Sequence, residues 1–500
     1  MPRFQKVSLA RSQMTTDQPS VAQDGLGETQ TDSAAKKGSA GSNASRRGSE
    51  LEPNASAAAN DNPASDLRNM RRIIAEDPEW SLATVPLLTD LCIRHIVHNF
   101  EINSRIIDKL LPKHKVKVLE KISEKLPLHV TANLIQDEGY WKRCCKARWE
   151  ICDVVQYGKS WKRMYFERNL QEKIEHFVPG SDLTEIKDTL LLSKNYVKKL
   201  DIRQLLPPVR ETPKIFQLDD DDAASDAGEE VDTDHFDFND IFKDLTELRE
   251  FKVVYGVRDC GMNFEWNLFQ FTARDCQQLS KCIASTKHLT SLSITRSKVD
   301  DDKIRVMISH ILDHPGLTEL DVSNNLIGDR GARAIGKFLN NHSQLVTICL
   351  ADNQIRAAGA SAIAHALTKN STLRVLNIRL NRIGDEGGQA ICKALIKNAT
   401  LEQLNMGSND LSEPTANGLG QVIAGNSVLK KIDISCNRIG VDGGKQLQQN
   451  MEDNKTVTHI DLRLTECGTE AEYCIYQILH TNRERERELS LQRAALPAAQ

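Results

Sequence analysis

The chain has 500 residues, of which 40% are hydrophobic and 27% charged, and its net charge is -4 at pH 7. This composition is typical of a soluble protein with two or three domains, and it lacks the basic surplus of a nucleic-acid-binding chain. No apolar run approaches the roughly 18 residues that cross a bilayer, so we expect no membrane association. The 12 cysteines form no CxxC pair and no zinc-finger spacing, which favours free thiols in a reducing compartment and no metal site.

The N-terminal part of the chain divides by composition. Residues 1–65 are rich in Ser, Ala, Asn, Gly and Thr and nearly lack large apolar side chains, which predicts a disordered tail. Residues 66–215 carry apolar residues at helical spacing, broken by prolines, and predict a mainly helical domain.

Within this domain, residues 140–170 interleave aromatic and basic side chains. Such a pattern can bind nucleic acid or an acidic protein, and it also fits buried aromatics beneath a basic face. We favour the buried aromatics because no nucleic-acid-binding motif accompanies the pattern. The candidate contacts for an acidic partner are Lys142, Arg143, Lys162 and Arg163.

Leu88, Cys92 and Ile96 match the spacing LxxxCxxxI, which resembles the elongin-binding box of ubiquitin-ligase adaptors, and Leu111 with Pro112 follows. Amphipathic helices often produce this spacing, so we expect these side chains in a core.

An acidic stretch separates the helical domain from the C-terminal half of the chain. Eleven of the 22 residues from 219 to 240 are Asp or Glu, and they lack the glycine-centred spacing of a calcium-binding loop. We interpret residues 216–244 as a solvated linker.

The chain repeats over residues 245–482. The pattern LxxLxLxxNxL, with a 28-residue period, is that of leucine-rich repeats and resembles their ribonuclease-inhibitor-like class, an α/β solenoid of short strands and helices. The recurring asparagines can satisfy backbone groups where the chain leaves each strand, and Asp329 and Asp385 can cap a repeat helix. The leading apolar residues are Leu289, Leu317, Leu345, Leu373, Leu401, Leu429 and Val457, and the asparagines are Asn325, Asn353, Asn381, Asn409 and Asn437.

The first unit is degenerate. It begins at Leu248, 41 residues before Leu289, so it holds 13 more residues than the period, and we place them between Val253 and about Ala273. The insertion either seals the apolar first edge of the solenoid, which we favour, or anchors a partner. Its aromatic residues are Phe264, Trp266, Phe269 and Phe271.

The strands predict a concave face with mixed polar side chains, which suits a protein ligand as well as it suits a merely solvated surface. The candidate contacts are Asp321, Arg379, Asp433, Asp461 and Arg463. Residues 483–500 are interpreted as a charged tail.

Catalytic and cofactor motifs are not apparent. Residues 331–337 match the start of a phosphate-binding loop, but Phe338 stands where the magnesium-binding hydroxyl belongs, and the segment falls in a repeat helix. We therefore expect no catalytic, cofactor-binding or metal-binding residues and no small-molecule substrate.

Four segments, residues 77–92, 158–170, 260–269 and 296–303, resemble the dynein regulatory complex subunit 5 family, and the resemblance extends from about Asn69 through the last repeat. It implies a non-enzymatic scaffold subunit of the nexin-dynein regulatory complex, which bridges outer doublet microtubules in the axonemes of motile cilia and sperm flagella and helps to regulate dynein-driven motility. The implied partners are the other subunits of that complex, with tubulin and dynein as further candidates.

Two alternatives remain open. Helices followed by leucine-rich repeats are also the layout of F-box adaptors, so the chain could be a ubiquitin-ligase adaptor that binds substrate through its repeats. A GTPase activator is the other, because that role is known among ribonuclease-inhibitor-like repeats.

Overall fold

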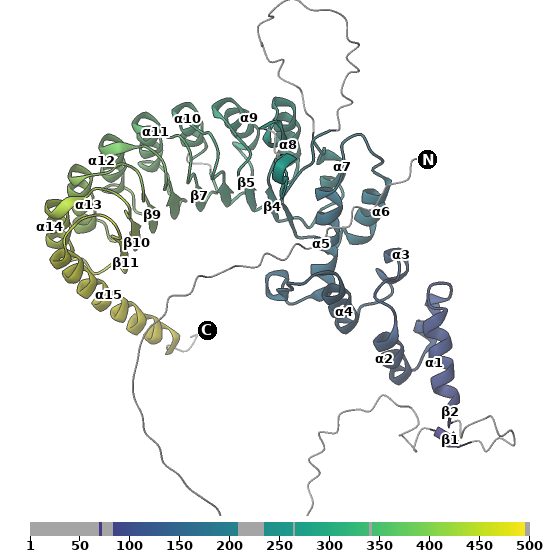
Figure 1. Cartoon of the computed structure of the whole chain (residues 1–500). Helices are drawn as coiled ribbons and strands as arrows, with labels where there is room; N and C mark the ends of the chain where they lie inside the picture. Colours follow the sequence, from purple (N-terminus) through teal and green to yellow (C-terminus); the bar gives the residue numbers. More distant parts are fainter. Residues whose placement is uncertain (1–69, 73–83, 209–234, 264–265, 340–342, 496–500) are drawn as a thin grey trace, which may run out of the picture. The chain divides into compact units, whose positions relative to one another are not determined.

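The computed structural model describes residues 70–72, 84–208, 235–263, 266–339 and 343–495, all within one compact unit, Asn69–Gln500. The repeats form an arc with the strands along its inner side and the helices along its outer side (Figure 1). The predicted α/β solenoid is confirmed.

One parallel sheet of nine strands runs through the described repeats, in the order β11-β10-β9-β8-β7-β6-β5-β4-β3. The central residue of each inner strand, such as Leu376 in β8, is buried against the helices, while its two neighbours face away from the core. The strands are β3 (Lys199–Ile202), β4 (Glu250–Val253), β5 (Ser291–Ile294), β6 (Glu319–Asp321), β7 (Thr347–Cys349), β8 (Val375–Asn377), β9 (Gln403–Asn405), β10 (Lys431–Asp433) and β11 (His459–Asp461).

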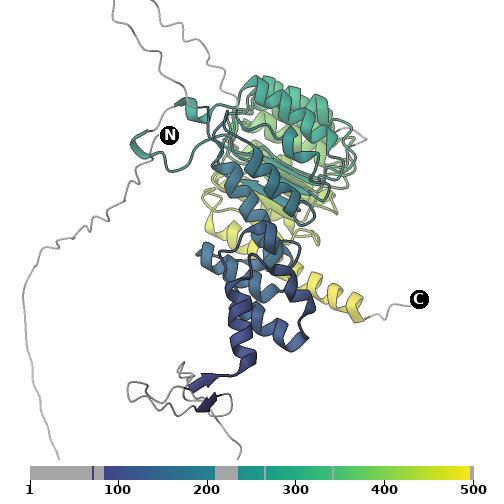
Figure 2. The ribbon, with the colours of Figure 1, turned by 90° about the vertical axis from the view of Figure 1, so that its right-hand side faces the viewer.

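The repeat helices lie side by side along the outer surface (Figure 2). Each one buries apolar side chains against its own strand and against the neighbouring helices, so the core is continuous along the array. The helices are α7 (Asn239–Phe242), α8 (Ala273–Ser285), α9 (Asp301–Ile311), α10 (Asp329–Phe338), α11 (Ala357–Leu367), α12 (Gly384–Leu395), α13 (Glu413–Gly425), α14 (Gly440–Met451) and α15 (Thr469–Ala495).

The asparagine ladder has the predicted role. Asn381 Nδ2 donates to the carbonyl oxygens of Leu350 at 2.9 Å and Ile378 at 2.9 Å, and its Oδ1 accepts from the amide of Ile355 at 3.0 Å. Asn325, Asn353 and Asn437 make the same kind of contacts, whereas Asn409 donates in the same way but its Oδ1 accepts no hydrogen bond from the described residues. One buried amide per repeat thus satisfies backbone groups of two adjacent repeats.

A second ladder, which we did not predict, lies at the carboxyl ends of the repeat helices. In it, Asn398 Nδ2 donates to the carbonyl of Asn370, and its Oδ1 accepts from the amides of Thr400 and Leu401. The other asparagines of this ladder are Asn370, Asn426, Asn454 and Asn482, of which Asn482 lies inside the longer helix α15.

His314 fills the equivalent place in an earlier repeat. Its Nδ1 accepts from the amides of Gly316 and Leu317, so Nε2 carries the proton that is donated to the carbonyl of Thr286 at 3.0 Å. Burial lowers the pKa of His314. This histidine therefore belongs to the interior of the solenoid rather than to its surface.

The aspartate caps act between repeats. Asp329 Oδ1 accepts from the amides of Arg356 and Gly359 at 2.8 Å, so it caps α11 of the following repeat. Asp385 likewise caps α13 through Ser412 and Thr415. A β-carbon added to Gly359 would lie 2.6 Å from Asp329 Oδ1, which explains the glycine at this position.

The helical part packs around aromatic side chains. Trp141 and Phe166 are buried with their ring centroids 5.3 Å apart, and Trp141 Nε1 donates to the carbonyl of Ile135 at 3.0 Å. Its elements are β1 (Met70–Arg72), β2 (Thr84–Pro86), α1 (Leu88–His98), η1 (Ser104–Lys109), α2 (Pro112–Lys121), α3 (Leu128–Thr131), α4 (Glu138–Arg148), η2 (Val154–Tyr157), α5 (Trp161–Glu175) and α6 (Thr184–Ser193).

Three expected boundaries differ from the structure. β3 comes from the expected helical domain but pairs with β4, so the sheet begins before the acidic stretch. Residues 235–242, expected in the solvated linker, bury Phe236, Phe238 and Phe242 in the solenoid core, because aromatic residues stand between the acids there. α15 continues into the expected tail and ends at Ala495.

The expected tail at residues 1–65 and most of the linker lie outside the described residues. Among those that are described, no helix is both long and apolar enough to cross a membrane.

Candidate protein-binding surfaces

The inserted segment lies between β4 and α8, as predicted, and includes η3 (Gly261–Asn263) and η4 (Trp266–Phe269). Phe271 is buried in the solenoid core, and its ring centroid lies 4.4 Å from that of Tyr255. Phe269 is half-buried beside Gly256 and lines a hollow of about 390 Å³ together with Arg296 and Leu326. Phe264 lies outside the described residues, and the structure does not describe the Trp266 side chain.

His235 fixes the end of the acidic stretch to the first repeat helix. Its Nδ1 lies 2.9 Å from Asp275 Oδ2, and its amide donates to Asp275 Oδ1 at 3.0 Å. Asp275 also forms a capping box with Thr272 at the start of α8. This contact holds His235 at the amino-terminal end of α8, whereas the first edge of the sheet is formed by β3.

The expected basic face of residues 142–163 is smaller than the sequence suggests. Lys162 is only 2% exposed. Its Nζ donates to the carbonyl of Ile135 at 3.0 Å and to Gln136 Oε1 at 2.8 Å, and it lies 4.6 Å from the ring centroid of Tyr196. Lys162 therefore cannot contact a partner on the surface, because its charge is stabilised inside an aromatic cage.

Two of the other candidates are engaged within the helical part. Arg143 donates to Glu124 and to the carbonyls of Leu119 and Ile122. Arg163 Nε forms a 2.7 Å ion pair with the buried Glu167, whose pKa is raised by burial.

Lys142 is exposed, and two further lysines that were not among the candidates, Lys146 and Lys159, are exposed as well. Arg148 is also exposed, but its guanidinium forms a 2.7 Å ion pair with Glu172. The basic surface that this segment offers to a partner therefore consists of the three lysines.

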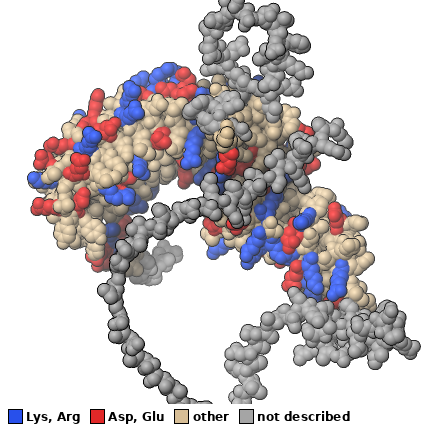
Figure 3. All heavy atoms as spheres, viewed as in Figure 1, with Lys and Arg blue, Asp and Glu red and all other residues tan. Residues whose placement is uncertain are grey.

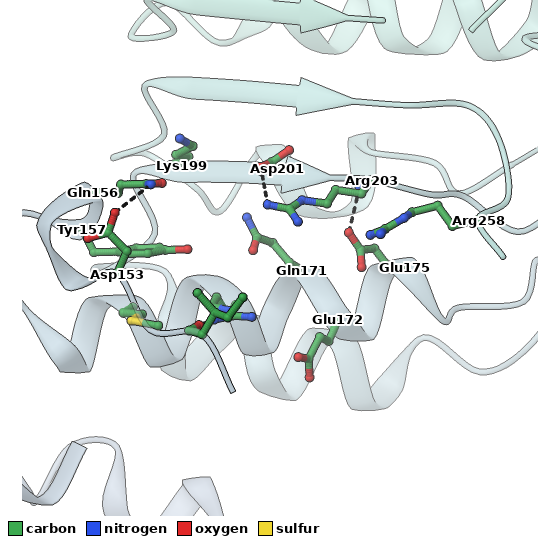
Figure 4. A pocket seen from close by; sticks show the side chains of 13 residues that line it. Asp153, Gln156, Tyr157, Gln171, Glu172, Glu175, Lys199, Asp201, Arg203 and Arg258 are labelled. Carbon is green, nitrogen blue, oxygen red and sulfur yellow. Dashed lines mark hydrogen bonds and ion pairs between the residues drawn. The ribbon is translucent and has the colours of Figure 1, made fainter. Parts of the chain in front are cut away.

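A polar cavity of about 370 Å³ lies between α5 and β3 (Figure 4). The amide of Arg203 donates to Glu175 Oε1 at 2.7 Å, and its guanidinium contacts Asp201 at 3.4 Å. Burial raises the pKa of Glu175. The contact between Glu175 and Arg203 connects the end of α5 to the end of β3, the first strand of the sheet. The labelled lining residues are Asp153, Gln156, Tyr157, Gln171, Glu172, Glu175, Lys199, Asp201, Arg203 and Arg258.

The predicted concave candidates lie at or just after the third residue of their strands. Asp321 and Asp433 are half-buried and accept from the amides of Ser323 and Ser435, two residues further on. These carboxylates thus stabilise the turn that leaves the strand, and they remain partly accessible from the concave side.

The two arginines on this face differ. Arg463 forms a bidentate pair with Asp461, and this hydrogen bond lowers the pKa of the Asp461 carboxyl. Arg379 is exposed, and its guanidinium has no hydrogen bond or ion pair with the described residues. Arg379 is therefore available to a carboxylate on another molecule. In Figure 3, positive and negative side chains are interspersed over the repeats.

The cysteines give no sign of a redox or metal site in the described part of the chain. No group of three or more His, Cys, Asp or Glu side chains is arranged to hold a metal ion there. Burial raises the pKa of Cys276, beside the insertion, to about 12. This thiol packs in the repeat helix at a position where other repeats place Ala or Gly.

Of the three residues with elongin-box spacing, Leu88 and Cys92 lie outside the core, contrary to the prediction, and only Ile96 packs against it. Leu88 is 75% exposed and Cys92 is exposed, whereas Ile96 is half-buried. The helix α1 packs through the buried Ile93 and through Ile96, which lies against the same core cluster, and not through Leu88 or Cys92.

Comparison with known proteins agrees with the repeats. The Leucine Rich repeat family model matches residues 315–336, 369–392 and 425–447. Among solved structures, an internalin from Listeria monocytogenes has a TM-score of 0.30 and 18% identity to this chain, and the match covers 47% of this chain and 67% of that one.

Two curated proteins are similar to this chain in sequence. Dynein regulatory complex subunit 5 from Homo sapiens is 51% identical over 260 residues, which are 52% of this chain and 52% of that protein. The protein of the same name from Chlamydomonas reinhardtii is 32% identical over 221 residues, 44% of this chain and 50% of that protein. The chain thus spans about half the length of these relatives. It contains leucine-rich repeats and, as the sequence predicted, is similar to proteins named dynein regulatory complex subunit 5.

Proposed function

We propose that the chain is a non-enzymatic scaffold subunit of the nexin-dynein regulatory complex in the axonemes of motile cilia and sperm flagella. In this role it would help to bridge outer doublet microtubules and to regulate dynein-driven motility. The observation that carries the proposal is the 51% identity to a named subunit over 260 residues. A solenoid whose concave face is open and polar also suits protein binding.

The test is replacement in motile-ciliated cells that lack the resident relative. The tagged full chain should co-sediment with axonemes, restore beating and, in proximity labelling, mark other subunits of the complex. A chain that is folded and expressed but absent from axonemes would overturn the proposal.

Within this proposal, the exposed lysines of the helical part contact an acidic partner, either another subunit or the acidic surface of tubulin. The triple variant Lys142→Glu, Lys146→Glu and Lys159→Glu should leave the axoneme at lower salt than the unmodified chain, because contacts between exposed charges are screened by salt. The matched control reverses three exposed lysines of the repeats, Lys369, Lys393 and Lys397. Equal salt sensitivity of the two triple variants would rule out a specific role for the first set.

The exposure of Leu88 and Cys92 keeps the ubiquitin-ligase adaptor as a second candidate. An adaptor should pull down elongin or Skp-type proteins and lose them in the double variant Leu88→Ala, Cys92→Ala. Retention of elongin or Skp-type proteins by this variant, or failure of the unmodified chain to pull them down, would exclude the use of this helix as an elongin-binding box.

A further inference from the structure

Each of seven repeats places a residue in the left-handed backbone region two or three positions after its strand, and a second such residue, Lys298, Asp410 or Glu466, follows in three of these repeats. The first such residue of each repeat has φ between 52° and 59°. Residues with a β-carbon are disfavoured in this conformation, and among them Asn and Asp adopt it most readily because their side chains can hydrogen-bond locally. The row consists of Arg296, Asn324, Asp352, Leu380, Ser408, Cys436 and Leu464.

The row changes character along the solenoid. The first three residues of the row have charged or amide side chains, whereas the last four have neither. Leu380 and Leu464 stand out because leucine is a poor choice for a left-handed backbone. They are also 45% and 79% exposed, so they recover little burial within the chain. Neither local conformation nor packing accounts for these leucines, which points to a contact outside the chain.

The backbone beneath these residues is fixed. The amide of Leu380 donates to the carbonyl of Gly407 at 2.9 Å, that of Ser408 to Ser435 at 2.8 Å, and that of Cys436 to Arg463 at 2.9 Å. The amides of Leu380, Ser408 and Cys436 have no capacity left for an added β-strand, so a partner docks on these three repeats through side chains.

The dimensions fit a helix. Leu380 and Leu464 are three strand spacings apart, which is about 14 Å at roughly 4.8 Å per strand. An α-helix rises 1.5 Å per residue, so a helix of about ten consecutive residues covers this distance, and its apolar face can lie over Leu380, Cys436 and Leu464.

The arginines beside the two leucines favour one direction for the docked helix. Arg379, next to Leu380, has no ion-pair partner among the described residues, whereas Arg463, next to Leu464, is already paired with Asp461. A carboxylate on the partner is therefore favoured at the Leu380 end and gains little at the Leu464 end.

We propose that Leu380, Cys436 and Leu464 form a docking row for an amphipathic helix of a partner protein that carries an acidic residue opposite Arg379. The inference rests on the proposed function, since it specifies how the scaffold would hold another subunit. In this arrangement both leucines serve binding at a cost to local backbone preference.

The test exploits that cost. In the double variant Leu380→Asn, Leu464→Asn, the new residues suit the left-handed backbone, so the thermal unfolding midpoint should stay the same or rise. Incorporation into axonemes, measured with the full chain in cells that lack the resident relative, should fall about tenfold or more because two apolar contacts are lost. Leu191→Asn changes a comparably exposed leucine of α6 and should leave incorporation unchanged.

A photo-crosslinker at Ser408, between the two leucines, identifies what lies over the row. In a chain that keeps Leu380 and Leu464, the crosslinks should map to a helix of another protein with an acidic residue near one end. The additional substitution Arg379→Glu should reduce the yield of these crosslinks. Normal incorporation of the double Asn variant, or crosslinks only to a second copy of this chain, would overturn the inference while leaving the proposed function intact. Failure of the unmodified chain to incorporate would overturn the proposed function, and this inference with it.

Discussion

The helical part and the solenoid satisfy their buried polar groups in different ways. In the solenoid, one amide per repeat, such as Asn381, completes the hydrogen bonds of two neighbouring repeats, and the arrangement recurs along the array. In the helical part, the partners of a buried polar side chain are particular to that site and do not recur. Lys162 lies among aromatic rings, and Glu167 accepts from Arg163 and from the amides of Lys198 and Lys199.

This difference decides which structural roles can be predicted from a sequence pattern. A residue that repeats every 28 positions indicates a shared structural role, whereas a single lysine among aromatics gives no sign of whether it lies inside or outside. The comparison also predicts that substitutions in the helical part act through one specific site, and that substitutions in the ladders act through the interface between repeats.

The largest effect is expected at the aromatic cage. Lys162→Glu would place a carboxylate against the faces of aromatic rings and the carbonyl of Ile135, and should lower the free energy of unfolding by about 4 kcal/mol. Lys142→Glu, on the surface, should change it by less than about 0.5 kcal/mol. Urea unfolding followed by tryptophan fluorescence monitors this region through Trp141, Trp149 and Trp161. Equal stability of the two variants would contradict the buried position of Lys162.

A smaller but still large effect is expected in the first ladder. Asn381→Ala would leave the carbonyls of Leu350 and Ile378 and the amide of Ile355 without this partner, and should cost about 3 kcal/mol. Asn377→Ala, on the concave side of the same repeat, should cost less than about 1 kcal/mol because its side chain is half-exposed. Circular dichroism during urea unfolding compares the two, and a similar loss in both would argue against the ladder as a main source of cohesion.

The smallest effect is a pH dependence at His314. Its pKa is lowered from 6.5 in the folded protein, so the unfolded chain binds the proton more readily, and stability should fall as the pH drops below about 6.5. Protonation of Nδ1 would break its bonds from Gly316 and Leu317.

His314→Asn installs the residue that later repeats use at this position and should reduce the stability lost between pH 7 and pH 5 by about 1 kcal/mol. The comparison is made by urea unfolding of both proteins at the two pH values. An unchanged pH profile in the variant would place the titrating group elsewhere.

Periodicity carried most of the solenoid prediction. Leucines and asparagines at fixed spacing predict the strands, the helices and the first ladder, because each repeat must bury the same face against its neighbours. The second ladder was equally visible as asparagines 28 residues apart, from Asn370 to Asn482, and was missed because it lies after the helix rather than at the strand. The insertion was located by its departure from the period.

The candidate contacts were less predictable. Lys142 and Lys162 have the same charge and similar neighbours in the sequence, yet one is exposed and the other buried. Leu88 was expected inside and lies outside. Whether such a side chain is buried or exposed depends on which side of its helix packs against the rest of the domain, and that side is set by contacts between residues distant in the sequence.

By itself, the sequence determined the repeat architecture, the polar residues that hold it together and the resemblance to the dynein regulatory complex subunit 5 family. Those properties depend on local pattern and spacing. Only the tertiary structure decided that β3 joins the sheet, that Phe236 and Phe238 enter the core, and that Leu380 and Leu464 point outward from a left-handed backbone. These properties depend on packing between distant segments, because burial and backbone conformation are fixed only when the whole array has formed.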